Sequence, residues 1–179
     1  WEIWMKYFDL CAALVVSSPA VSEEFGTLEG TLNGEDRVWY TIAISSGDAY
    51  NASATYKQGF MNTYDLHIQG HPRPSFTTTD VLSIDAPLTA ELEPGETPIN
   101  VEIMHFPEGM SKPIWTSTGD PASATLIVDS LETAAVGGVG QLIGSFQGKV
   151  CYQEMMSGMP DPNNCRVVEG KVHTKLLFR

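Results

Sequence analysis

The stretch that decides the fold lies near the end of the chain. It reads GSFQGKV over Gly144–Val150 before Cys151, and RVVEGKV over Arg166–Val172 after Cys165. Each arm mixes β-branched or aromatic residues with polar ones, and the link between the cysteines is rich in Gly, Pro and Asn. This pattern predicts a closing hairpin of two strands with a long irregular tip.

Working outward, similar patterns recur along the chain. Asn33-Gly34 separates the strand-like runs Thr27–Leu32 and Arg37–Ile44, and Asn-Gly is the strongest short hairpin signal because both turn positions need positive φ. Apolar and polar residues also alternate over Ile99–Phe106, which predicts a half-buried strand. Further strands are expected over Asn51–Tyr56, Thr63–Gln69, Val81–Asp85 and Ala124–Val128, and in a final hairpin of Leu142–Tyr152 with Val167–Phe178.

These runs define the expected fold class. About nine or ten short strands at this spacing are typical of an all-β antiparallel domain. We expect a single jelly-roll-like β-sandwich over residues 23–179, with a closed β-barrel as the alternative. The total of 179 residues is enough for one domain with a sizeable core.

The first residues are expected to precede the folded domain. Met5-Lys6, the apolar run Leu10–Val16 and the small residues around Ala20 follow the pattern of a secretory signal peptide. We assign residues 1–22 to this leader, with Trp1–Trp4 as extra residues before a start at Met5. An ordinary amphipathic N-terminal segment is the alternative. The apolar run is too short for a membrane-spanning helix, so a secreted or periplasmic location without stable membrane insertion is predicted.

Loss of the leader would remove Cys11 and leave two cysteines, Cys151 and Cys165. Two cysteines that flank one turn in an exported chain predict a disulfide, which would stabilise the fold by about 3 kcal/mol in the chain-entropy model. Two separate buried thiols are the alternative if the chain is not exported.

The chain is acidic, with a formal net charge of −12 and a sequence pI near 4.5. An acidic surface repels phosphate backbones and anionic lipid head groups, which disfavours nucleic acid as a partner. The acidity is accounted for by solubility. The expected partner is therefore an unidentified protein or a small ligand.

Three short motifs indicate a known class of protein. They are Gly30–Gly34 followed by Trp39, the strand Ala124–Val128, and the terminal pair Gly144–Phe146 with Val168–Val172. With these motifs the chain resembles uncharacterised exported bacterial β-sandwich domains. The resemblance implies a β-sandwich fold and an extracytoplasmic compartment, and it implies no catalytic residues.

The sequence contains few candidates for catalysis. Gly144-Ser145 lies in a predicted strand, where no strand-to-helix turn would expose the serine as a nucleophile. His67 and His71 are four residues apart, which would suit a metal on a helix but not on an extended strand. We therefore predict a non-enzymatic protein without a cofactor or a metal.

Methionines gather in the predicted tip, at Met155, Met156 and Met159. Their thioethers, with those of Met104 and Met110, would suit Cu(I). The favoured interpretation is an apolar contact surface, because methionines adapt readily to neighbouring surfaces.

Aromatic residues provide the second candidate site. Trp39 and Trp115 could form the binding platform of a sugar or apolar ligand, although aromatic residues in strands more often belong to a core. The other aromatic residues of this candidate platform are Tyr40, Tyr50, Tyr56, Phe60 and Tyr64. The sequence predicts an exported, non-enzymatic domain with a structural or interaction role at the cell envelope or outside it. A small-ligand or carbohydrate-binding domain is the alternative.

Overall fold

The computed structural model describes residues 21–47, 49–119, 122–155 and 157–179. In this part of the chain all regular structure is β-strand, apart from one short 3₁₀ helix over Phe60–Asn62. The expected all-β class is therefore confirmed. The described residues form eleven strands where about nine or ten were expected, and all of these strands belong to one hydrogen-bonded sheet.

The first hairpin joins β1 (Val21–Leu32) to β2 (Glu35–Ser46). Asn33 and Gly34 form its turn with φ values of 54° and 81°, as the Asn-Gly signal predicts. β1 begins two residues before the expected start of the domain, since Val21 and Ser22 already pair with β2. The rest of the predicted leader lies outside the described residues.

The last hairpin is the longest in the molecule. β10 (Val139–Gln153) pairs antiparallel with β11 (Asp161–Phe178) from Val139, opposite Leu177, to Tyr152, opposite Asp161. The predicted hairpin is confirmed, but its tip is shorter than expected because β11 starts at Asp161. The irregular tip consists of the described residues 154–155 and 157–160, and the name "tip" refers to these residues below.

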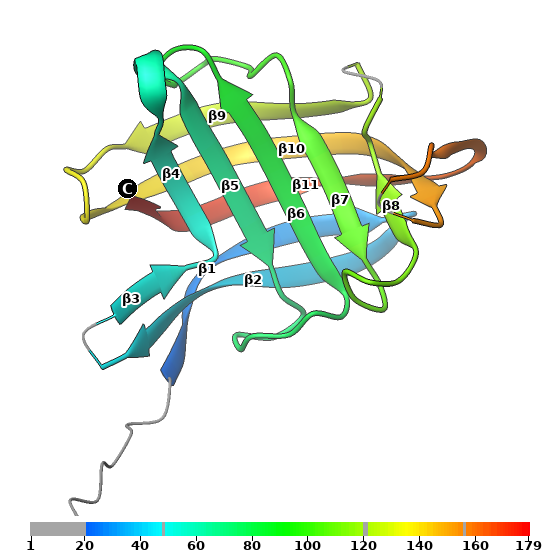
Figure 1. Ribbon diagram of the computed structural model, residues 1–179, viewed down its shortest axis with the longest axis horizontal. Helices are drawn as coiled ribbons and strands as arrows, with labels where there is room; N and C mark the ends of the chain where they lie inside the picture. Colours follow the sequence, from blue (N-terminus) through cyan, green and yellow to red (C-terminus); the bar gives the residue numbers. More distant parts are fainter. Residues whose placement is uncertain (1–20, 48, 120–121, 156) are drawn as a thin grey trace, which may run out of the picture.

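A second group of strands, β4 to β8, lies across a first group that contains the strands of the two hairpins. β5 pairs antiparallel with β4 and β6, β6 with β7, and β7 with β8. Figure 1 shows this group in front, with β1, β2, β9, β10 and β11 crossing behind it. The bounds are β4 (Ala54–Gln58), β5 (Tyr64–Gly70), β6 (Val81–Leu88), β7 (Glu102–Phe106), β8 (Ile114–Thr116) and, at the two ends of the strand order, β3 (Ala49–Ala52) and β9 (Ala124–Glu132).

Two connections join the groups. β11 pairs with β4 in parallel at Leu177 and Phe178, and β10 pairs with β8 over Cys151–Gln153. The expectation of a purely antiparallel sheet is therefore wrong, because the β4 contact makes the sheet mixed. Strand pairing can be followed from β11 through β4, β5, β6, β7 and β8 to β10, and from β10 back to β11.

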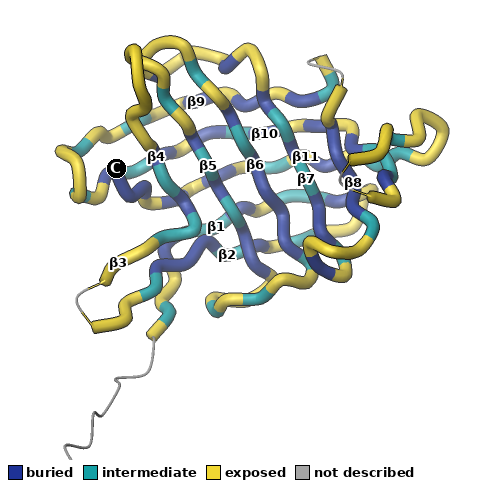
Figure 2. Tube along the Cα trace, in the orientation of Figure 1, coloured by how far each residue is buried: buried dark blue, intermediate teal, exposed yellow. Residues whose placement is uncertain are grey.

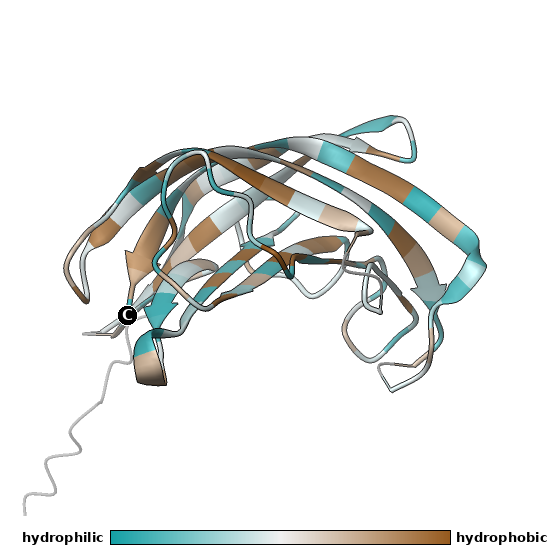
Figure 3. Cartoon of the chain, turned by 90° about the horizontal axis from the view of Figure 1, so that it is seen from above, coloured by the Kyte–Doolittle hydropathy of each residue, from teal (hydrophilic) through white to brown (hydrophobic). Residues whose placement is uncertain are grey.

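The core lies between the two groups of strands. Figure 2 shows buried segments along the middle of the strands and exposed segments at their ends and in the loops. In Figure 3 hydrophobic and hydrophilic segments alternate along the curved strands. The alternation arises because successive side chains point to opposite faces, so one set fills the core and the other faces water. Fully buried side chains of this core include Leu28, Trp39, Ile68, Ile84 and Leu176.

Several predicted boundaries differ from the structure. The expected strand Asn51–Tyr56 is divided between β3 and β4, and β6 and β9 extend beyond their expected ends at Asp85 and Val128. β7 starts at Glu102, and Ile99, which was expected in this strand, is 82% exposed in the preceding loop. Ile114 and Trp115, for which no strand was predicted, form β8 between β7 and β10. A three-residue strand carries too little periodicity to be recognised, so its neighbours in space determine it.

Candidate functional site

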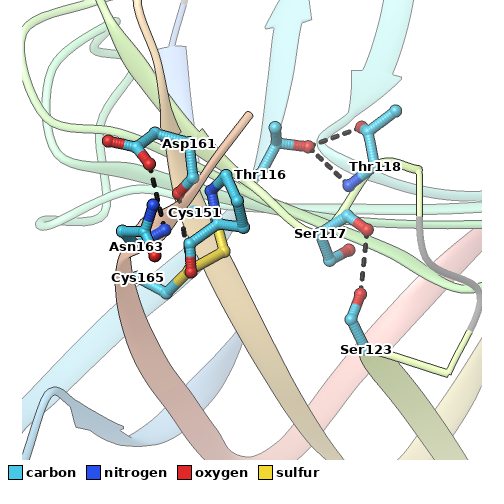
Figure 4. Close-up of a disulfide and its surroundings, with 9 residues drawn as sticks. Thr116, Ser117, Thr118, Ser123, Cys151, Asp161, Asn163 and Cys165 are labelled. Carbon is cyan, nitrogen blue, oxygen red and sulfur yellow. Dashed lines mark hydrogen bonds between the residues drawn. A yellow bond between two sulfur atoms is a disulfide. The ribbon is translucent and has the colours of Figure 1, made fainter. Parts of the chain in front are cut away.

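Cys151 and Cys165 lie directly opposite each other in the β10–β11 register, with their Sγ atoms 2.03 Å apart. This distance is that of a disulfide bond, so the predicted pairing is confirmed. Figure 4 shows the bond at the end of the hairpin, beside the turn in which the Asn163 backbone N–H donates to the Asp161 carboxylate at 3.0 Å. The disulfide therefore closes the base of the tip.

The tip carries two of the three predicted contact methionines into solvent. Met155 is 65% exposed and Met159 is 92% exposed, while Met156 lies outside the described residues. The Met155 carbonyl accepts hydrogen bonds from the Gln153 side chain and the Gly158 backbone N–H, at 2.7 and 2.8 Å. The backbone of the tip is thus held in a turn, and its apolar side chains are free to touch another molecule.

Met104 does not join this group, because it packs on β7 against a small apolar cluster of Val81, Phe106 and Ile114. Met110 is 55% exposed in the loop between β7 and β8. Among the described residues no group of three or more His, Cys, Asp or Glu side chains is placed to hold a metal ion.

The two tryptophans proposed as a ligand platform belong to the core instead. Trp39 is 1% exposed, and Trp115 is 8% exposed. The Arg166 guanidinium lies 3.7 Å from the centroid of the Trp115 ring, and Tyr152 meets the same ring edge-on at 5.7 Å. Trp115 therefore helps to close one end of the core, next to the disulfide.

A polar cluster that the sequence did not single out lies at the same end, made by Arg37, Asp80 and His105. The His105 Nε2 atom is 2.8 Å from one carboxylate oxygen of Asp80, and Arg37 is 3.7 Å from the other. Asp80 has a φ of 54°, in the left-handed region that non-glycine residues rarely adopt. No motif predicts this cluster, because its members come from β2, from the connection between β5 and β6, and from β7.

Burial is the main cause that lowers the pKa of His105 below its ordinary value of 6.5, and Arg166 and Arg37 add to the effect. The hydrogen bond with Asp80 opposes it. His105 is therefore neutral near pH 7, and its Nδ1 atom is buried without a hydrogen-bond partner. We name Arg37, Asp80, His105, Trp115 and Arg166 the "polar end" of the core.

His67 was a candidate metal ligand with His71, but the two side chains have different partners. The His67 ring lies 2.5 Å from Asp85, whose other carboxylate oxygen accepts the Ser83 hydroxyl at 2.8 Å. His71 is buried, and its ring Nδ1 atom forms a hydrogen bond with the Thr77 backbone carbonyl. The hydrogen bond with Asp85 is the main cause that raises the pKa of His67, whereas burial lowers the pKa of His71.

The residue types of a serine triad thus meet on β5 and β6, but in the wrong order. In a triad the histidine stands between the serine and the carboxylate, where it removes the hydroxyl proton. Here Asp85 stands between His67 and Ser83, and the serine hydroxyl donates its proton to a carboxylate. This arrangement places no histidine against the Ser83 hydroxyl to act as the base of a triad.

Three aromatic side chains meet at the other end of the core. The rings of Tyr56 and Tyr64 stack with centroids 5.5 Å apart, and Phe178 lies 5.3 Å from Tyr56. They line a pocket of about 340 Å³. Tyr56 and Tyr64 were among the aromatic residues noted in the sequence, whereas Phe178 was not, since only the fold brings the end of β11 beside β4.

Comparison of the chain with protein-family models, with curated proteins and with solved structures finds no match. No helix among the described residues is long and apolar enough to cross a membrane.

Proposed function

We propose that this chain is an exported, non-enzymatic domain that contacts a partner protein through the tip between β10 and β11. The observation that carries the proposal is the exposure of Met155 and Met159 on a loop whose base is closed by the Cys151–Cys165 disulfide. Large apolar side chains that face water favour association, because contact with a partner removes their surface from solvent.

Two properties of the tip suit it to this role. The disulfide and the turn around Met155 restrict the loop before binding, so less conformational entropy is lost when a partner docks. Methionine side chains are flexible and polarisable, and they fit irregular apolar surfaces well. A short loop of this kind corresponds to a small contact rather than to a large permanent interface.

Export is supported by the cysteine pair and by the leader-like pattern of the first residues. Disulfides persist in oxidising compartments outside the cytoplasm, and a paired Cys151–Cys165 is compatible with such an environment. The resemblance to uncharacterised exported bacterial β-sandwich domains points the same way. We therefore propose a secreted or periplasmic location.

For the architecture we infer the closed barrel rather than the jelly-roll sandwich. The reason is the circular order of pairing, in which β11 bonds β4 and β10 bonds both β8 and β11. A sandwich of two separate sheets leaves edge strands on each sheet, whereas this order joins the two groups of strands at both sides.

The absence of enzymatic activity is part of the proposal. A non-enzymatic role is supported by the order of Ser83, Asp85 and His67, which leaves the serine without a histidine base. It is supported further by the polar end, where the Asp80 carboxylate is engaged by both Arg37 and His105.

The test is site-specific photo-crosslinking in cells that naturally carry the protein. A benzophenone amino acid at position 159 is expected to give a defined adduct with a partner protein. The matched control places the same group at Ile99, an apolar residue of another loop that is 82% exposed, compared with 92% for Met159. Equal adducts from both positions, or none from position 159, would contradict the proposal.

A further inference from the structure

We propose that the pocket lined by Tyr56, Tyr64 and Phe178 binds a single neutral sugar residue, such as the terminal pyranose of a glycan. This site is independent of the tip, and it lies at the opposite end of β11. Its aromatic floor, its polar rim, its size and its charge all match this class of ligand.

The floor of the pocket is aromatic and rigid. Tyr56 stacks on Tyr64 with an angle of 23° between the ring planes, and it lies against Phe178 at 51°. The Tyr56 hydroxyl accepts a hydrogen bond from the Leu92 backbone N–H at 2.9 Å, which fixes the ring. Tyr56 and Phe178 are buried, whereas Tyr64 is half-buried and contributes accessible aromatic surface.

The rim of the pocket is polar. Gln58, Glu91 and Thr133 line it and are exposed, and within the described part of the chain their side chains have no hydrogen-bond partner. Arg179 also lines it, and its guanidinium donates to the Asn51 side chain. The rim therefore offers a carboxylate, an amide and a hydroxyl to a ligand, which together donate and accept hydrogen bonds.

Backbone hydrogen bonds hold the floor and the rim in one frame. The Gln58 N–H donates to the Arg179 carbonyl at 3.0 Å, and the Arg179 N–H donates to the Tyr56 carbonyl at 2.9 Å. On the other side, Gly137 donates to Phe178 at 2.7 Å, and Phe178 donates to Gly138 at 3.0 Å. The pocket is thus formed before a ligand arrives, which lowers the entropic cost of binding.

Size and charge select the ligand class. A volume of about 340 Å³ lies at the lower end of the range for small-molecule sites, which suits one sugar ring rather than a long chain or a large cofactor. A pyranose has an apolar C–H face that packs on an aromatic ring and hydroxyls that reach a polar rim. The opposite charges of Glu91 and Arg179 balance at the rim, which suits a neutral ligand rather than a charged one.

Another pocket, of about 280 Å³, lies beside the connection between β6 and β7, and it is lined by Leu88, Leu92 and Pro98. Its walls contain no aromatic ring. The chemistry that recognises a sugar face is therefore better provided by the pocket at Tyr64.

The experiment titrates the folded protein with glucose, galactose, mannose and N-acetylglucosamine, each followed by two-dimensional NMR. One of these sugars is expected to bind with a dissociation constant of about 1–10 mM, which is typical of a small, weakly buried ligand. Amide shifts should map to residues 56–64, 91, 133–138 and 178–179. Glycerol at the same concentration is the control for unspecific contact.

Two variants test the assignment. Tyr64→Ala removes the accessible ring and should weaken binding about tenfold, and Glu91→Gln, which keeps the shape of the rim, should weaken it about threefold. Val167→Thr, at an exposed position near the start of β11, should leave binding unchanged. The NMR spectrum of each variant reports whether it is folded.

Three results would overturn the proposal. They are no shift in the pocket with any of the four sugars, equal shifts with glycerol, and unchanged binding by a folded Tyr64→Ala variant.

Discussion

The two ends of the core both include part of β11, but their polar side chains are arranged differently. β11 passes Arg166 at the polar end and finishes at Phe178 in the aromatic pocket, and the twelve residue steps from Arg166 to Phe178 span about 40 Å. At the polar end charged side chains contact each other and Trp115. At the aromatic end polar side chains surround a pocket without bonding each other.

This difference indicates that the polar end contributes mainly to stability and the aromatic end mainly to ligand recognition. Polar groups that lose contact with water need partners, and Asp80 supplies one to the partly exposed Arg37 and to the buried, neutral His105. Exposed polar groups such as Gln58 and Glu91 keep their hydrogen-bonding capacity for solvent or a ligand. We therefore expect substitutions at the polar end to change the free energy of unfolding, and substitutions at the aromatic end to change binding.

The largest effect is expected from Trp115→Ala. Loss of a buried tryptophan leaves a cavity and removes the surface on which Arg166 packs, so unfolding should become easier by about 3–5 kcal/mol. Urea unfolding followed by far-UV circular dichroism measures the change. Tyr64→Ala, which removes the half-buried ring of the aromatic end, is the control and should lower the free energy of unfolding by less. A greater loss for the control would reverse the assignment of the two ends.

Next in size is removal of the disulfide by Cys151→Ser together with Cys165→Ser. The bond spans 14 positions of sequence, and a loop of this length stabilises the folded state by about 3 kcal/mol in the chain-entropy model. Guanidinium unfolding of the variant and of the oxidised protein measures the difference. Sugar binding at the aromatic end should be unaffected. A loss below about 1 kcal/mol would mean that the tip is held chiefly by its turn and strand pairing.

A smaller loss is expected from substitution of Asp80. Asp80→Ala removes the carboxylate from His105 and Arg37 and places alanine at a positive φ. Because the Asp80 and Arg37 side chains are 35% and 39% exposed, we expect a loss of about 1–2 kcal/mol. Asp80→Asn keeps one acceptor oxygen and a residue type that tolerates this conformation, so it should cost less. Thermal unfolding compares the two. Equal losses of stability in the two variants would show that neither the left-handed backbone conformation of residue 80 nor the remaining acceptor oxygen contributes to stability.

The smallest effect is expected in the pH dependence of stability, which should differ between the buried His105 and His67. His67 pairs with Asp85 about midway along β6, between the two ends of the core. Because the pKa of His105 is lowered by folding, the unfolded chain binds its proton first, and His105 reduces stability as pH falls below about 6.5. Because the pKa of His67 is raised, this pair stabilises the fold below about pH 6.5, and the stabilisation is lost as pH rises through the folded pKa.

Proton NMR titration of the two imidazoles between pH 4 and 9 tests these directions. His67→Gln should remove the stabilisation on the acid side only, and the change should be small because the His67 side chain is 40% exposed. Titration of His67 at or below its ordinary pKa would contradict the assignment.

Local sequence patterns predicted a large part of the fold. Asn33-Gly34 identified the first hairpin, and the two arms around the cysteines identified the last one, because turn chemistry and alternation are local properties. The same reasoning failed at Ile99, where alternation continued into a loop, and at Trp115, where a three-residue strand left no periodic signal.

The candidate sites were predicted less well. The exposed methionines of the tip followed from composition and from the position of the turn. The polar end and the aromatic pocket could not be predicted, because Asp80 and His105, or Tyr64 and Phe178, are far apart in the chain. Trp39 and Trp115 look alike as candidate ligand contacts in the sequence, and burial is what assigns both to the core.

The sequence by itself determined the β class, the two hairpins and the pairing of Cys151 with Cys165, since each depends on residues close together or on a residue type with one favoured partner. Only the tertiary structure decided that β11 meets β4 in parallel and that charged residues gather at one end of the core and aromatic residues at the other. The physical reason is that these contacts join residues distant in the chain, and their positions depend on how the whole sheet closes around its core.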